Sequence, residues 1–251
     1  MALKIKIKNN LFIVAFLIAL SSCESDSNSS AQETSSDGIG GSLATFSLAG
    51  NYLYTVDNQD LNVFSIVDNE QPVQVNEIPI GFNIETLFNY KQYLFIGSQN
   101  GMYIYSVANP ETPEYMSEAQ HFTACDPVVA NDTHAFVTLH SDIGCGNTLN
   151  QLEIYNIENI QNPVLLSTRN LTKPIGLGLY NDYLIICDDE VKIFDISEPE
   201  NIQLVHNINR DAFDVIIQNN LLILVGEFGV YQYSLDENNI QNTIELSTIN
   251  I

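Results

Sequence analysis

The sequence predicts an all-β protein, a β-propeller of about five four-stranded antiparallel blades, over residues 43–251. Three observations predict it: one unit recurs five times, its central strand is apolar on both faces, and tight turns separate its strands. The centres of the recurring central strands lie 41, 41, 49 and 38 residues apart. Repeats of about 40 residues made of short strands are typical of propellers, because a single unit cannot bury its own apolar faces.

Each unit is expected to begin with an inner strand, followed by the central strand. The inner strands are expected at 44–48, 84–88, 127–130, 175–179 and 213–217. The central strands are expected at 52–56, 93–97, 134–138, 183–187 and 221–225. A central strand such as the last, Leu-Leu-Ile-Leu-Val, has no polar face and must therefore lie between two other layers. The links between strands are too short for helical crossovers, which predicts antiparallel pairing.

Turns and two outer strands complete each unit. Gly-Asn, Asn-Asp or Asn-Asn pairs precede four of the central strands, where a hairpin needs residues that tolerate positive φ. A loop that usually holds proline ends the third strand, because proline cannot donate to a sheet ladder, and a more polar fourth strand such as 73–80 follows. The third strands are expected at 63–66, 104–107, 154–157, 193–196 and 232–235, and the five units at about 43–82, 83–122, 123–172, 173–210 and 211–251. A closed and an open ring of blades both remain compatible with this pattern.

The first 22 residues are predicted to be a signal peptide. Lys4, Lys6 and Lys8 precede an apolar stretch at 11–20, which is shorter than the ~20 residues that span a bilayer and suits an export signal. The following Leu-Ser-Ser-Cys resembles the lipobox of bacterial lipoproteins. That resemblance implies a lipid on Cys23 and a membrane anchor in the cell envelope, with the outer membrane expected. The polar, acidic residues 23–42 are expected to form a flexible tether.

The charge balance excludes one class of partner. Without residues 1–22 the chain keeps five basic residues against 31 acidic ones, a formal charge of −26. Such a field repels phosphate backbones, so no nucleic-acid partner is expected. The simpler explanation of the acidity is that it keeps an exported protein soluble.

The third unit carries the one sizeable insertion, residues 140–151. In a four-stranded blade, the entrance to the inner strand and the link after the central strand lie at the same end, which brings Cys125 close to Cys145. Exported proteins meet oxidising conditions, so a Cys125–Cys145 disulfide is expected, worth ~3 kcal/mol in the chain-entropy model. Cys187 ends the next central strand at that same end. It is expected to be a buried free thiol, with pairing to another cysteine as the alternative.

The same insertion is the predicted binding loop. Loops held on a rigid scaffold concentrate binding groups, which makes His140, Asp142 and Asn147 the candidate contacts. The histidines and cysteines of this unit match no zinc spacing, and no cofactor is expected. Asp188 and Asp189 are candidates for calcium on composition alone, and a solvated acidic rim explains them more simply.

Several blocks of the sequence resemble the LVIVD repeat of bacterial surface and secreted proteins. These blocks are Val-Phe-Ser-Ile at 63–66, Cys-Asp-Pro at 125–127, Cys-Gly at 145–146, Ile-Cys-Asp at 186–188 and Ile-Phe-Asp-Ile-Ser at 193–197. The resemblance extends over about 200 residues and implies a β-propeller lipoprotein of the cell envelope, without an assigned activity. Ile175 departs from the pattern, because a histidine is expected before the Gly-Leu-Gly run.

The sequence favours a non-enzymatic binding or scaffold protein that engages an unknown protein or glycan through the loops at the Cys125 end. It holds no nucleophile motif such as G-x-S-x-G. The alternative is a metal-dependent hydrolase or lactonase with its site at the mouth of the propeller channel, where Glu85, Asp126 and Asp214 are expected on or beside inner strands. A purely structural subunit of a surface complex is a third possibility.

Overall fold

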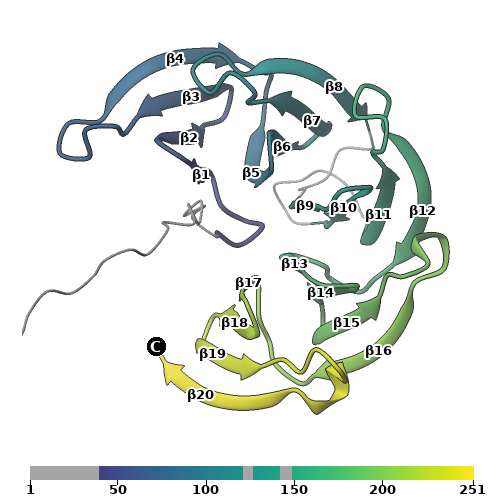
Figure 1. Cartoon of the computed structure of the whole chain (residues 1–251). Coiled ribbons are helices and arrows are strands. Elements are labelled where there is room, and N and C mark those ends of the chain that lie inside the picture. Colours follow the sequence, from purple (N-terminus) through teal and green to yellow (C-terminus); the bar gives the residue numbers. More distant parts are fainter. Residues whose placement is uncertain (1–39, 121–126, 142–148) are drawn as a thin grey trace, which may run out of the picture. The chain divides into compact units, whose positions relative to one another are not determined.

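The structure is a computed structural model that describes residues 40–120, 127–141 and 149–251. Its strands form five four-stranded antiparallel sheets, in each of which the spatial order is the chain order (Figure 1). These sheets are the blades, numbered 1 to 5 along the chain. The predicted all-β, five-bladed β-propeller is therefore confirmed.

Each blade contributes one strand to each of four layers. The inner strands are β1 (Phe46–Ala49), β5 (Ile84–Tyr90), β9 (Val128–Ala130), β13 (Leu177–Tyr180) and β17 (Asp214–Gln218). The central strands are β2 (Tyr52–Val56), β6 (Tyr93–Ser98), β10 (His134–Leu139), β14 (Tyr183–Cys187) and β18 (Leu221–Gly226). The third strands are β3 (Asp60–Ser65), β7 (Gly101–Ser106), β11 (Gln151–Asn156), β15 (Val191–Asp195) and β19 (Gly229–Ser234). The outer strands are β4 (Val73–Pro79), β8 (Glu114–Gln120), β12 (Val164–Asn170), β16 (Gln203–Ile208) and β20 (Ile244–Asn250), and two short 3₁₀ helices are η1 (Pro199–Asn201) and η2 (Ile240–Asn242).

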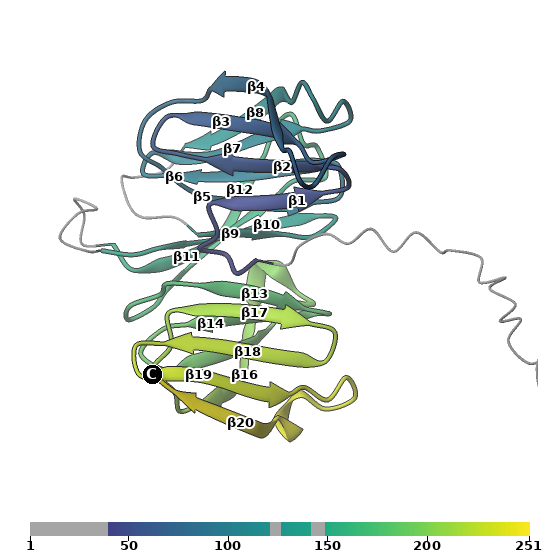
Figure 2. The same ribbon diagram turned by 90° about the vertical axis from the view of Figure 1, so that its left-hand side faces the viewer.

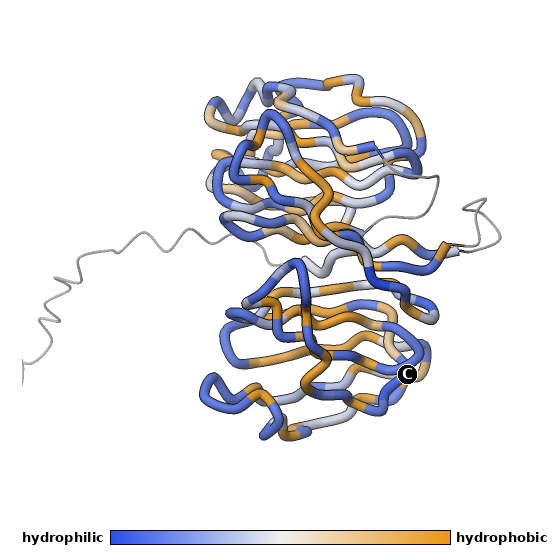
Figure 3. The backbone as a smooth tube through the Cα atoms, turned by 90° about the vertical axis from the view of Figure 1, so that its right-hand side faces the viewer, coloured by the Kyte–Doolittle hydropathy of each residue, from blue (hydrophilic) through white to orange (hydrophobic). Residues whose placement is uncertain are grey.

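The core lies between successive blades rather than inside any one of them. Hydrophobic residues concentrate along the strands, and hydrophilic ones occupy many of the turns (Figure 3). A buried cluster joins each consecutive pair, represented by Tyr54 and Leu94 between blades 1 and 2, Phe95 and Val137 between 2 and 3, Phe136 and Leu184 between 3 and 4, and Ile185 and Leu222 between 4 and 5. This arrangement is what the doubly apolar central strands predicted.

Blades 5 and 1 are not joined in this way. Across the described ranges, no buried cluster links these two blades, and their sheets stand apart when viewed from that side (Figure 2). The central strand of blade 5 is therefore covered on one side only. Leu222 and Leu224 are buried, whereas Leu221, Ile223 and Val225 are half-buried. The blades thus form an open arc, which answers the question that the sequence left undecided.

The part of the chain that the structure describes holds no helix long and apolar enough to cross a membrane.

Candidate functional site

Most of the site predicted from sequence falls outside the described residues. Cys23, Cys125, Cys145, Asp142 and Asn147 all lie in residues that the structure does not describe. The lipid attachment, the disulfide and most of the binding loop therefore stay predictions, as does the channel role of Asp126.

Cys187 lies within the described part of the chain. It is a free cysteine with no exposed surface, and burial raises the pKa of its thiol. The prediction of a buried free thiol is confirmed.

The two ends of the predicted binding loop are held together by the blade. Leu139 pairs with Gln151 in the β10–β11 ladder. The backbone N–H and the hydroxyl of Ser141 both donate to Asn150 Oδ1, over 3.0 and 3.2 Å. His140 is half-buried just after β10, so it belongs to the base of the loop.

A buried carboxylate beside this loop was missed by sequence reasoning. Glu153 of β11 is only 4% exposed. It accepts hydrogen bonds from Gln151 Nε2 at 2.7 Å and from the hydroxyl of Tyr155. The sequence does show a glutamate inside an otherwise apolar run. The side of β11 that carries Glu153 is buried because it packs against blade 2, and no local pattern reveals that contact.

The two calcium candidates share one ammonium group. Lys192 Nζ lies 2.6 Å from Asp188 Oδ2 and 2.5 Å from Asp189 Oδ1, and this hydrogen bond lowers the pKa of Asp189. Asp188 also accepts from the backbone N–H groups of Thr172, at 3.0 Å, and Lys173. These contacts attach Thr172 and Lys173, which link blades 3 and 4, to the turn between β14 and β15. A cation bound at this turn would have to compete with Lys192 for the two carboxylates.

Asp214, at the start of the inner strand β17, contacts the segment that precedes blade 1. We call this segment, residues 40–43, the leading segment. Asp214 accepts hydrogen bonds from the backbone N–H groups of Ser42, Leu43 and Val215. A Cβ on Gly41 would lie 2.0 Å from Asp214 Oδ2, so only glycine permits this approach. Burial is the largest influence on Asp214 and raises the pKa of its carboxyl despite the hydrogen bonds. Asp214, which was predicted to line the channel, thus holds residues 41–43 in place.

This burial gives a pH-dependent prediction for Asp214→Asn. A carboxyl whose folded pKa is raised contributes stability that is present below its unfolded value of 3.8 and lost as the pH rises through the folded value. We therefore expect the stability of the variant, relative to the parent, to increase between pH 4 and pH 7 in thermal melts. Asp236→Asn is the control of opposite sign, because the backbone N–H of Asn238 lowers the pKa of Asp236. Parallel pH profiles for Asp214→Asn and the parent would contradict the assignment.

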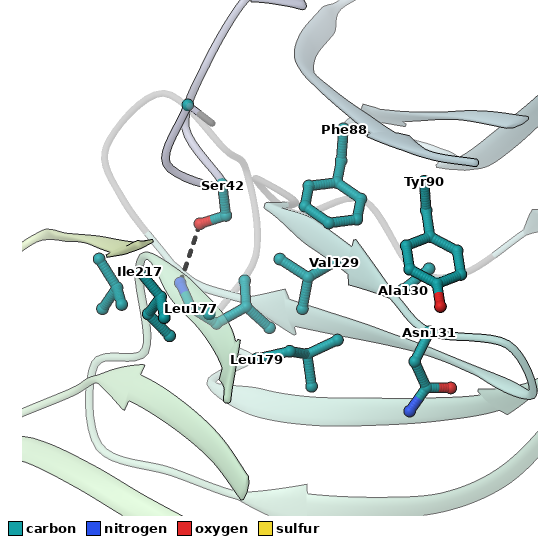
Figure 4. A pocket seen from close by; sticks show the side chains of 12 residues that line it. Ser42, Phe88, Tyr90, Val129, Ala130, Asn131, Leu177, Leu179 and Ile217 are labelled. Carbon is teal, nitrogen blue, oxygen red and sulfur yellow. Dashed lines mark hydrogen bonds between the residues drawn. The ribbon is translucent and has the colours of Figure 1, made fainter. Parts of the chain in front are cut away.

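An apolar pocket of about 230 Å³ lies among the inner strands (Figure 4). Its walls come from blades 2 to 5 and from the leading segment. The side chains that define it are Phe88, Tyr90, Val129, Leu177, Leu179 and Ile217. Among the described lining residues there is no carboxylate, imidazole or basic group, so they offer shape and apolar contact rather than acid–base chemistry.

Blade 5 presents an apolar sheet face toward the opening of the arc. Opposed residues of an antiparallel ladder point to the same side, and Val215, Leu222 and Leu224 point toward blade 4. The alternate residues therefore form the other side, which we call the blade 5 end face. Its apolar members are Ile216, Leu221, Ile223, Val225 and Val230, and the polar residues Asp214, Gln218, Gln232 and Ser234 lie on the same side.

Blade 1 presents a second uncovered face. Tyr54 and Val63 point toward blade 2, so the alternate positions form the blade 1 end face. Its apolar members are Phe46, Leu48, Leu53 and Phe64, of which Phe46 is 52% exposed.

Comparison with known proteins gives a fold and no family. No family model and no curated protein matches the sequence, so the resemblance to LVIVD-repeat proteins stays a prediction. A protein from Lactobacillus plantarum matches with a TM-score of 0.66 and 10% identity, over 79% of this chain and 67% of that one. A functionally unknown protein from Desulfotomaculum acetoxidans matches with a TM-score of 0.65 and 11% identity, over 86% of this chain and 69% of that one.

A third solved structure has a named activity. The periplasmic gluconolactonase PpgL of Pseudomonas aeruginosa matches with a TM-score of 0.62 and 13% identity, over 80% of this chain and 68% of that one. At such identities the likeness concerns the path of the backbone and not the chemistry. The chain shares the β-propeller fold with these proteins over most of its own length and about two thirds of theirs.

Proposed function

We propose that this protein is a non-enzymatic binding or scaffold module of the bacterial cell envelope, an LVIVD-type propeller held to a membrane by a lipid on Cys23. The observation that carries the binding role is the blade 5 end face. The anchor rests on the lipobox-like end of the predicted signal peptide, and the resemblance to LVIVD repeats supports the same location.

The central part of the blade 5 end face is apolar. In β10 and β14 the central positions on both sides are buried, whereas in β18 the equivalent aliphatic positions on one side are only half-buried. Fully burying a Leu, Ile or Val side chain contributes about 1.5–3 kcal/mol, so several adjacent half-buried positions leave apolar surface that a partner could cover. Contiguous apolar surface on a soluble domain marks interaction sites.

The chemistry of this face favours a protein partner over a glycan. Its apolar members are all aliphatic, and none of them offers the aromatic ring that would stack on a sugar. Each solved chain described above also extends beyond its match by about a third of its length. At about 40 residues per repeat, that third is room for about two further blades. A partner that presents an apolar β-sheet fits this opening.

The rival hydrolase or lactonase is not favoured by the site. Glu85 Oε1 accepts a hydrogen bond from Gln99 Nε2 at 3.0 Å, and Asp214 is occupied by the leading segment. The gluconolactonase match is a likeness of fold at 13% identity and supports no transfer of activity.

Photo-crosslinking in cells tests the proposal. We expect p-benzoylphenylalanine placed at Ile223 or Leu53, one on each end face, to give a discrete crosslinked species. The same residue at Leu204, 43% exposed on β16, is the control. The mass of the species separates a second copy of this chain from another protein, and adding Val225→Asp should remove the crosslink at 223. Equal, diffuse labelling at all three positions would refute an end-face partner.

A further inference from the structure

We propose that the pocket among the inner strands binds a small, uncharged, mainly apolar ring compound with one polar end. This site is separate from the end faces, and the inference does not depend on the proposed function. It rests on the volume, lining and two unlike ends of the pocket.

The volume and the walls suit a single-ring ligand. A dry apolar cavity of ~150 Å³ is enough to bind benzene, and this pocket measures about 230 Å³. Val129 and Leu177 are 2% and 0% exposed and belong to the core between blades 3 and 4. Side chains locked in a packed core keep the pocket formed before a ligand arrives, which reduces the cost of binding.

The leading segment covers one end of the pocket. Ser42 Oγ accepts the backbone N–H of Leu177 over 2.8 Å, and Gly40 and Ser42 both line the pocket. On the adjoining wall, a Cβ on Gly178 would lie 2.8 Å from Val215 Cγ1, so β13 and β17 pack without space between them. This covered end limits the length of a ligand.

The opposite end is polar. Tyr90 and Asn131 lie there, away from Ser42 (Figure 4). Asn131 Oδ1 accepts the backbone N–H groups of Thr133 and His134, at 3.0 and 2.8 Å, which fixes the orientation of the amide. With its oxygen used in this way, the amide nitrogen is the group that would donate to a ligand hydroxyl or carbonyl.

Charge narrows the ligand class further. The described lining residues carry no charged group, so a buried ionic ligand would lose its hydration without gaining a counter-charge. The large excess of acidic residues in the chain also repels anions. A neutral ring compound with a hydroxyl or carbonyl satisfies both conditions.

p-Cresol is the probe for this site, and benzoate is its anionic counterpart. The chain contains no tryptophan, so Phe88→Trp places the single tryptophan of the variant in the pocket, where it can be excited selectively at wavelengths that tyrosine does not absorb. We expect saturable quenching of that fluorophore by p-cresol, matched by calorimetric binding to the parent protein, and at least tenfold weaker binding of benzoate. Leu204→Trp, on the outer strand β16, should show no saturable change.

Pocket-filling variants decide the location. Leu179→Trp should weaken p-cresol binding at least tenfold, and Asn131→Ala should weaken p-cresol several-fold while leaving toluene unchanged. Ile217→Phe is the second filling variant, used where Leu179→Trp melts below the parent. Unchanged p-cresol affinity in a filling variant that melts like the parent would overturn the proposal, as would absence of binding to the parent at millimolar concentrations.

Discussion

Replacing Phe136 with alanine should bring the protein close to unfolding. Phe136 has no exposed surface and belongs to the cluster with Leu152, Leu184 and Phe194 between blades 3 and 4. Truncating a buried Phe to Ala costs about 3–5 kcal/mol, against a total stability of about 5–15 kcal/mol for a typical domain. We expect a large fall in the urea midpoint or loss of soluble expression.

The matched control for this prediction is Leu246→Ala. Leu246 lies on the outer strand β20 and is 56% exposed, so its truncation should change stability by no more than about 0.5 kcal/mol. Equal urea midpoints for Phe136→Ala and the parent would show that the contact between blades 3 and 4 does not stabilise the fold.

Replacing Cys23 with alanine should move the protein almost completely from the membrane fraction to the soluble fraction. The predicted anchor is a lipid on this thiol, and an alanine side chain cannot carry that lipid. Fractionation of cells and labelling with radioactive palmitate measure the change. Cys187→Ala is the control, because its thiol is buried and free, and it should leave the distribution unchanged. Retention of the Cys23→Ala variant in membranes would contradict the lipoprotein assignment.

The sequence located the strands because their pattern is local. The central strands of blades 1 and 4 have the predicted bounds, Tyr52–Val56 and Tyr183–Cys187. The third strands begin two or three residues before the apolar runs that marked them. In blade 1, for example, Asp60 opens β3 and Asn62 pairs with Thr55. A ladder of backbone hydrogen bonds continues through polar residues, so an apolar run underestimates its length.

The site could not be predicted in the same way, because its parts are distant in the chain. The hydrogen bond between Ser42 and Leu177 joins residues 135 positions apart, and the pocket takes its walls from four inner strands. Asp214 appeared in the sequence as an acidic residue for the channel. Only the packing of the leading segment against it shows why its carboxyl is buried.

The sequence by itself determined the repeat, the blade and the need of each apolar strand for cover on both sides. The alternation and spacing of side chains are properties of each segment, and they hold wherever that segment lies. Whether the last blade meets the first depends on the angle between neighbouring blades, which accumulates over four interfaces and is set by how their side chains interlock. Tertiary structure alone decided that blades 5 and 1 do not pack together within the described residues, leaving Ile223 and Leu53 on faces that no other blade covers, and that a pocket forms among the inner strands.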